Sequence, residues 1–205
     1  MEEFSYRSLT MSDVEQAAEV ISQAFEHDPL CAFMLPNKRT RVRALRKFFR
    51  PYGEIFIKNQ RGFGVGEPLK GVAFWLPPSA MQLSISIKTL GSFLPLLFTR
   101  YPIGYLRARA ILKQTDLMHH RYAPQPHYYL DNIGVLPAER GKGVSSSLIR
   151  PFLAKADAEG VLVYTDTVTR GNVALYEHFG FICMEERPVE GTGITVWALQ
   201  RPVRS

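Results

Sequence analysis

Glycines and basic residues gather in one short stretch of the chain, between two apolar segments. In Arg140-Gly141-Lys142-Gly143 two glycines alternate with an arginine and a lysine, and Ser145 and Ser146 follow. Glycine lets an anion approach the backbone closely, and the two cations add positive charge. Apolar residues at helical spacing begin just after the loop, so the free N–H groups at the start of a helix would point at the same place. This pattern favours a diphosphate site over a simple surface turn.

The spacing of glycines within the loop distinguishes between the common classes of diphosphate-binding motif. A Walker loop requires GxxxxGK followed by Ser or Thr, whereas Gly141-Lys142 is followed by Gly143, and Leu136 stands where the first glycine belongs. The dinucleotide pattern GxGxxG begins at Gly141 and Gly143 but has Ser146 in place of its third glycine. We therefore exclude the ATP pattern and keep the NAD pattern only as a distant alternative.

Histidine and cysteine could carry metal chemistry, but their spacing does not favour it. His119 and His120 are adjacent on an expected helix, so they point in different directions, and no third ligand stands at a ligating spacing. Cys31 and Cys183 lie far apart without a CxxC or Cys/His pattern. We expect neither a metal site nor a disulfide framework, and we interpret both cysteines as small apolar residues in a reducing compartment.

Hydrophobic periodicity indicates the elements that must position the loop. A strand is expected at 127–135, directly before the loop, and a helix at 145–159, directly after it. Residues 80–121 are expected to form a helical insert between the third and fourth strands. Further strands are expected at 4–9, 61–66, 69–76, 161–167, 181–186 and 194–199, and helices at 14–25, 38–50 and 172–178. This order predicts a single α/β layered domain over 1–205 rather than an all-parallel sheet.

Composition and charge limit the class of protein. The chain has 205 residues, 46% of them hydrophobic, and a formal net charge of +6. Seven of the 25 basic residues fall within 38–50, so the excess charge belongs to one segment, which we interpret as an amphipathic helix with a solvated cationic face. Lys88, Gly91 and Pro95 interrupt the apolar stretch 81–100, which argues against a membrane span. We expect a cytoplasmic protein that binds neither nucleic acid nor membrane.

The loop and a second segment together resemble a known enzyme family. Arg140-Gly-Lys-Gly-Val-Ser145 is similar to the Q/R-x-x-G-x-G/A signature of the GCN5-related N-acetyltransferases (the GNAT superfamily), with Ser145 where Gly or Ala is usual. Downstream, Asn172, Tyr176 and Gly180-Phe181 match the spacing of the family's N-x-x-x-Y-x-x-x-G-F region. The stretches FEHDP at 25–29 and FWLPP at 74–78 further resemble the puromycin N-acetyltransferase-like branch.

The resemblance implies a fold, a co-substrate and a set of roles. The fold would be a mixed, mostly antiparallel sheet of about six to seven strands flanked by helices, and the co-substrate would be acetyl-CoA, with no metal. Tyr176 would protonate the coenzyme A thiolate, Asn172 and the backbone of the strand would hold the pantetheine, and the loop would hold the pyrophosphate. The expected cofactor-binding residues are Ile133, Gly134, Val135, Arg140, Gly141, Lys142, Gly143, Val144, Ser145, Ser146 and Asn172.

The general base and the acceptor site are less defined by the sequence. Tyr129 falls about where some relatives carry a glutamate, and Asp131 and His127 share its strand face, so either could take the proton of the amine. Asp28 and Glu26 could attract a cationic acceptor. Trp75 could wall the acceptor pocket, together with the aromatic residues Phe93, Phe98, Tyr101 and Tyr105.

We expect direct transfer of the acetyl group to a primary amine of a small molecule, in a ternary complex. One alternative is a non-catalytic acyl-CoA-binding or regulatory domain with the same loop. Another is acetylation of a protein lysine or N-terminus, which the aromatic-rich insert disfavours because it would cover the acceptor side. The C-terminal strands could form a homodimer interface.

Overall fold

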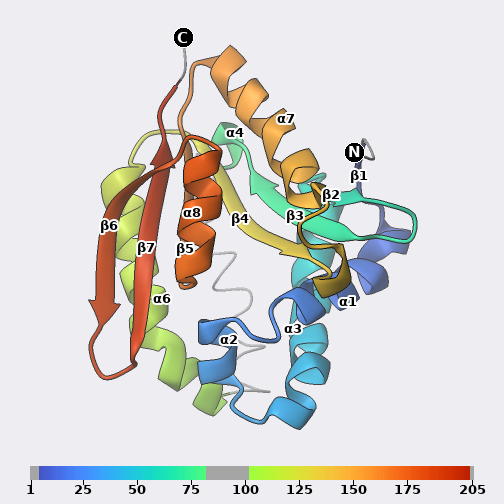
Figure 1. Cartoon of the computed structure of the whole chain (residues 1–205), viewed down its shortest axis with the longest axis vertical. Coiled ribbons are helices and arrows are strands. Elements are labelled where there is room, and N and C mark those ends of the chain that lie inside the picture. Colours follow the sequence, from blue (N-terminus) through green and yellow to red (C-terminus); the bar gives the residue numbers. More distant parts are fainter. Residues whose placement is uncertain (1–4, 82–101, 204–205) are drawn as a thin grey trace.

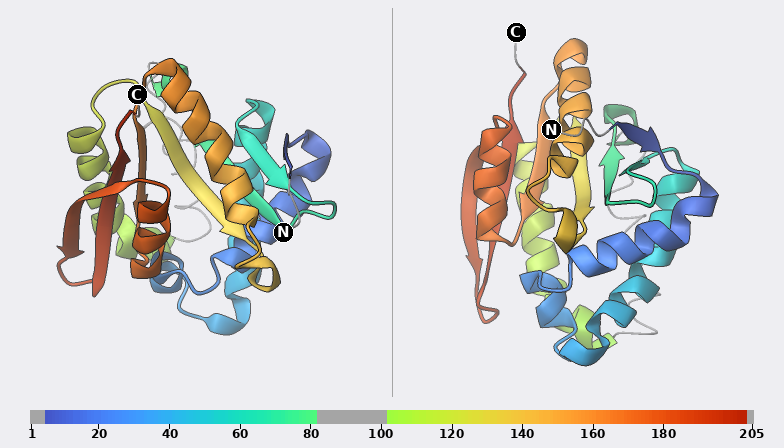
Figure 2. Two further views of the ribbon diagram at one scale, coloured as in Figure 1. Left: turned by 45° about the horizontal axis from the view of Figure 1, so that its top comes forward. Right: turned by 45° about the vertical axis from the view of Figure 1, so that its right-hand side comes forward.

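The computed structural model describes residues 5–81 and 102–203, and they form one mixed sheet with helices on both faces (Figures 1 and 2). The sheet has seven strands in the order β1-β2-β3-β4-β5-β7-β6, and β4 and β5 are its parallel pair. The strands are β1 (Tyr6–Ser8), β2 (Gly62–Val65), β3 (Gly71–Leu76), β4 (Tyr128–Val135), β5 (Val163–Thr167), β6 (Ile182–Val189) and β7 (Ile194–Arg201). The expectation of a mixed, mostly antiparallel sheet of six to seven strands is confirmed.

Helices cover the two faces of the sheet in different combinations. α7 (Val144–Glu159) and α8 (Arg170–His178) pack on one face, around the buried rings of Trp75 and Phe152. α1 (Val14–Ala24) and α3 (Lys38–Lys58) cover β3 and β4 on the other face, and α6 (Pro102–Tyr122) covers β5 and β7. The shorter helices are α2 (Pro29–Met34), α4 (Pro78–Met81) and the 3-10 turns at Met11–Asp13 and Pro137–Glu139. Phe93, Phe98 and Tyr101 belong to residues 82–101 of the expected insert, which lie outside the described residues.

The first helices show how local signals set the boundaries. Thr10 and Asp13 form a capping box ahead of α1, and the Arg7 guanidinium donates to Asp13 at 2.8 Å, which completes the start of the helix. Pro29 does more than end the first helix: it occupies the first turn of α2, where its missing N–H is harmless, and the Asp28 side chain caps that helix. α2 was not expected from the sequence because it has only six residues.

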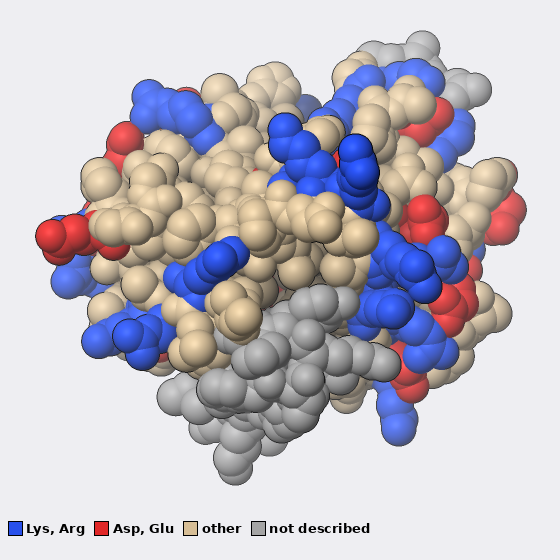
Figure 3. Space-filling view, turned by 90° about the horizontal axis from the view of Figure 1, so that it is seen from below, with Lys and Arg blue, Asp and Glu red and all other residues tan. Residues whose placement is uncertain are grey.

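The basic segment is longer and less solvated than expected. α3 continues past Pro51 to Lys58, and Arg46 and Arg50 form ion pairs with Glu15 on α1. The expectation of a wholly solvated cationic face is wrong at Arg41, which is 4% exposed and donates to the carbonyl oxygens of residues 26, 35 and 36. On the face seen in Figure 3, basic and acidic side chains lie interspersed along one side.

The sheet opens between its two central strands, which creates space for a ligand. β4 and β5 pair only at Tyr128↔Val163 and Tyr129↔Tyr164, although β5 continues to pair with β7 as far as Thr167. A bulge at Asp131 adds to the divergence, because β3 pairs with Leu130 and Asn132 and skips the residue between them. The opening lies at the carboxyl ends of the parallel strands, where α7 and α8 begin and where ligands of such sheets bind. Within the described residues, no helix has both the length and the apolar character to cross a membrane.

Candidate active site

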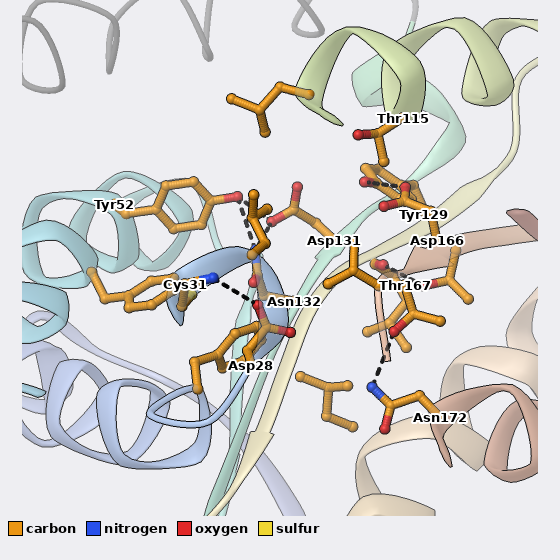
Figure 4. A pocket seen from close by; sticks show the side chains of 18 of the residues that line it. Asp28, Cys31, Tyr52, Thr115, Tyr129, Asp131, Asn132, Asp166, Thr167 and Asn172 are labelled. Carbon is orange, nitrogen blue, oxygen red and sulfur yellow. Dashed lines mark hydrogen bonds between the residues drawn. The ribbon is translucent and has the colours of Figure 1, made fainter. Parts of the chain in front are cut away.

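A cavity of about 340 Å³ occupies the opening between β4 and β5 (Figure 4), a volume in the usual range for small-molecule sites. Its floor comes from residues 129–133 on β4, residues 165–167 on β5, and Asn172 and Tyr176 on α8. Its remaining walls come mainly from apolar residues of α2 and α3, with part of α6. One continuous cavity therefore connects the start of α8 with the region between α2, α3 and α6.

The glycine loop adopts the geometry that an anion site requires. Gly141 has φ +77° and Gly143 has φ +92°, a left-handed backbone that only glycine adopts readily. Gly143 is the N-cap of α7, and no side chain in the described part of the chain caps that end, which leaves the first N–H groups of this 16-residue helix available. A Cβ added at either glycine would have no described atom within 4 Å, so the loop faces open space.

The side chains of the loop take distinct positions. Arg140 Nη2 donates to the Ala24 carbonyl oxygen at 3.0 Å, which ties the loop to the end of α1, and exposed Lys142 lies 3.3 Å from a Glu139 oxygen. Val144 is buried against the sheet, so only its backbone can face the loop. Ser145 and Ser146 lie half-buried in the first turn of α7.

The expected pantetheine-binding strand lies beside the opening. Beyond Tyr129 no residue of β5 pairs with β4, so the backbone edge at Ile133, Gly134 and Val135 has no strand partner there. Ile133 lines the cavity, and Gly134 lets α1 approach, because a Cβ there would lie 2.9 Å from the Cβ of Ala24. The structure thus places these three residues between the cavity and the glycine loop.

Two residues of α8 expected from the sequence also face the cavity. Tyr176 lines it and is otherwise buried, and burial raises the pKa of its hydroxyl to about 12, against a hydrogen bond with Thr165 that acts in the opposite direction. The phenol is therefore protonated at neutral pH, as a proton donor must be. Asn172 lines the same cavity, and its amide donates to Thr167 Oγ1 at 3.1 Å.

The expected acidic residues Asp131 and Asp28 both line the cavity. Asp131 sits at the bulge of β4 and accepts hydrogen bonds from the Tyr52 hydroxyl and, at 2.7 Å, from the Asn132 amide (Figure 4). Asp28 accepts the Cys31 N–H at 3.0 Å as the cap of α2. Burial raises the pKa of both carboxyls, since it disfavours the charged form. No basic side chain among the described residues forms an ion pair with either carboxyl to offset this effect.

Trp75 and His127 are not at the cavity, and we correct these two expectations. The Trp75 indole stacks on Phe152 at 4.7 Å on the α7 side of the sheet, and its N–H donates to the Leu148 carbonyl, so it is a core residue. His127 is fully buried and absent from the described lining, and its Nε2 lies 2.8 Å from that of His119, which does line the cavity. Glu26 and Tyr105 are also absent from the described cavity lining.

Sequence reasoning missed Asp166 on β5. It lines the cavity and accepts a hydrogen bond from the Tyr129 hydroxyl at 3.0 Å, and burial, with the nearby charge of Asp131, raises its pKa to about 7. The available signal was a lone carboxylate in the otherwise uncharged strand Val163–Thr167. Among the described residues, no group of three or more His, Cys, Asp or Glu is arranged to hold a metal ion.

Comparison with known proteins places this geometry in a family. The model of the Acetyltransferase (GNAT) family matches residues 74–181, more than half of the 205-residue chain. The matched region includes the diverging strands, the glycine loop and α8.

Individual relatives agree with this match. An uncharacterized N-acetyltransferase of Schizosaccharomyces pombe is 28% identical over 180 residues, which are 83% of this chain and 71% of the relative. The solved structure of arylalkylamine N-acetyltransferase 2 from Aedes aegypti has a TM-score of 0.69 at 13% identity, covering 99% of this chain and 100% of that one. A structure from Corynebacterium glutamicum, described as a histone acetyltransferase and related acetyltransferase, has a TM-score of 0.66 at 21% identity, covering 98% and 97%. With the loop, the divergent strands and α8 in the arrangement described above, the chain belongs to the GNAT family of acetyltransferases.

Proposed function

We propose that this protein transfers the acetyl group of acetyl-CoA to a primary amine of a small molecule, by direct attack in a ternary complex. The observation that carries the proposal is one cavity lined both by Tyr176 and Asn172 and by the partly buried carboxylates Asp131 and Asp166. The first pair suits a departing thiolate, and the second pair suits a cationic amine. A single cavity brings the two reactants within reach of each other, which is the main requirement of direct transfer.

The glycine loop fits the coenzyme. A diphosphate needs backbone N–H donors and a concave, uncrowded surface, and the loop offers the uncapped start of α7 with open space above Gly141 and Gly143. Lys142, which is half-exposed, supplies a cation at the same place. The bound thioester would supply an activated acetyl group, and the residues of β4 from 133 to 135 would hold its pantetheine arm.

The shape and chemistry of the other end of the cavity support a small acceptor. Its walls are aromatic and aliphatic side chains of α2 and α3, including Met34, Leu45 and Phe49. Among the described residues, no basic side chain forms an ion pair with Asp131 or Asp166. An amine with an apolar body would place its ammonium group at the carboxylates and its body against these walls. The Aedes aegypti neighbour is named for arylalkylamines, which have this form.

The proposal is tested by thiol release from acetyl-CoA with a panel of amines. The panel should include a phenylalkylamine, a polyamine, an aminoglycoside, free amino acids and a lysine-containing peptide, each with mass analysis of the product. We expect release with one or more small amines and a product that carries one added acetyl group. Tight coenzyme A binding without turnover would favour a non-catalytic acyl-CoA-binding domain, and turnover of the peptide alone would favour a protein acetyltransferase.

A further inference from the structure

Asp166 and Asp131 occupy matching positions on the two strands that diverge. The last pair of the parallel ladder is Tyr129↔Tyr164, and each aspartate lies two residues further along its own strand. Residues two apart point to the same side of a strand, so both carboxylates belong to the side of the sheet that faces the cavity. Both line the cavity and are partly accessible through it, and both are labelled in Figure 4.

The surroundings of Asp166 are polar but carry no positive charge. The Tyr129 hydroxyl donates to its Oδ2 at 3.0 Å, and no Lys or Arg among the described residues forms an ion pair with it. The ring of His119 on α6 packs against Tyr129 at 4.4 Å, and burial lowers the pKa of this imidazole to about 3, so it is neutral as well. The titratable groups that face Asp166 from the neighbouring elements are Tyr52, His119, Tyr129, Asp131, Tyr164 and Tyr176.

Asp131 and Asp166 accept different numbers of hydrogen bonds from neighbouring side chains, and we base their different roles on this difference. Oδ2 of Asp131 accepts from both Tyr52 and Asn132, and two donors favour the charged form. Asp166 has one such donor, and burial, together with the nearby charge of Asp131, raises its pKa to about 7. Burial raises the pKa of both carboxyls, so the difference between them lies in their donors: Asp131 is fixed by two, and Asp166 keeps more of its oxygen lone pairs free to accept a proton.

We propose that Asp166 is the general base that takes the proton of the incoming ammonium group, and that Tyr129 positions its carboxylate while Asp131 holds the amine. The inference rests on the proposed function. The ammonium ion gives one proton to Asp166, and the neutral nitrogen then forms a C–N bond with the thioester carbonyl carbon. The C–S bond breaks with its electron pair on sulfur, Tyr176 protonates the thiolate, and the second proton of the attacking nitrogen restores Tyr176. Asp166 releases its proton through the cavity to water.

The proton affinity of Asp166 can be tested without activity. Carbonyl-¹³C aspartate labelling and NMR titration of the free protein should show one carboxyl that titrates near pH 7 and whose signal is lost in Asp166→Asn. Tyr129→Phe should raise that titration point, because it removes a donor to the charged form, and Asp131→Asn should lower it, because it removes a neighbouring charge. The inference is overturned if no aspartate titrates between pH 6 and pH 8.

Kinetics then test the role. At pH 7 we expect Asp166→Asn to lower kcat by about 10²- to 10⁴-fold with the Kd of acetyl-CoA unchanged within twofold. The kcat of Asp166→Asn should rise about tenfold per pH unit up to the pKa of the amine, because in this variant the amine must lose its proton to water. The kcat of the wild type should instead level off above pH 7. Tyr129→Phe should move the wild-type pH profile toward higher pH.

Two outcomes contradict the assignment and are distinguishable from each other. If the wild type acetylates an amine and Asp166→Asn retains kcat within threefold, another group is the base and the proposed function stands. If no amine supports turnover by the wild type, the proposed function and this inference fail together.

Discussion

Replacement of Gly143 by alanine tests the glycine loop as the coenzyme site. Gly143 has φ +92°, and an L-residue in the left-handed region costs about 1–2 kcal/mol. The added Cβ would have no described atom within 4 Å, so no clash inside the protein adds to this cost. The methyl group would instead project into the open space where the diphosphate is proposed to lie. We expect the Kd of coenzyme A to rise about tenfold or more, which corresponds to about 1.4 kcal/mol.

Gly160→Ala is the matched control. Gly160 ends the same helix, has φ +66°, and likewise has open space around a new Cβ, so the backbone strain should be similar while the change lies at the far end of α7. Thermal unfolding should show comparable destabilisation of the two variants, and calorimetric titration with coenzyme A should show a weaker Kd only for Gly143→Ala. Equal effects of the two substitutions on Kd, or no effect of either, would refute the placement of the diphosphate at this loop.

Four further predictions concern single side chains. Tyr176→Phe should lower kcat by one to three orders of magnitude with the Kd of acetyl-CoA unchanged, and an unchanged kcat in steady-state assays would exclude it as the proton donor. Ser145→Gly should weaken coenzyme A binding in calorimetry if the hydroxyl is a ligand, and tighten it if the serine only crowds the phosphates. Arg201→Ala should lower the free energy of unfolding, measured by urea titration, by about 3 kcal/mol. The reason is that the Arg201 side chain is 5% exposed and donates to both carboxylate oxygens of Asp157. A loss under 1 kcal/mol would contradict this prediction. The pKa of Asp166 is near 7 in the folded protein, above its ordinary value near 3.9, so the unfolded protein gives up this proton at lower pH. The wild type should therefore lose up to about 4 kcal/mol of stability as the pH rises from about 4 to 7. Asp166→Asn should remove this loss, and melting curves of wild type and variant with parallel pH dependence would contradict the prediction.

Local patterns predicted the parts of the site that lie in one continuous segment. The glycine loop and its helix follow from the coincidence of small residues, cations and the start of a hydrophobic periodicity, and the structure has them at Arg140–Gly143 and Val144–Glu159. Asn172 and Tyr176 were identified through the resemblance to the N-x-x-x-Y segment of the GNAT family, and their spacing of four residues on a short helix places both on one face. Such features depend on residues that are close together in the chain, so they can be predicted from the sequence.

Parts of the site that depend on contacts between distant segments could not be predicted from the sequence. All six residues of β3 are buried, so no alternation of polar and apolar residues distinguishes its two faces, and Trp75 faces α7 while Leu76 lines the cavity. Asp166 meets the cavity only because of the register between β4 and β5, which a 16-residue helix and its loops separate in the chain. Arg41 is buried by carbonyl groups of the α1–α2 and α2–α3 connections, which no pattern within its own helix reveals.

Some expectations stay predictions. These are the single domain over 1–205, the cytoplasmic location, the homodimer of the C-terminal strands and the resemblance to the puromycin N-acetyltransferase-like branch.

The most direct test of the central claim follows the acetyl group itself. The protein is incubated at pH 8 with acetyl-CoA labelled with ¹³C in the acetyl carbonyl and with a small primary amine that supports thiol release, and the label is followed by NMR. The account predicts that the thioester signal is replaced by an amide signal in step with the appearance of free coenzyme A thiol, and that this exchange is strongly slowed in Tyr176→Phe. A label that stays on coenzyme A with every amine, or that appears only as free acetate, would contradict it.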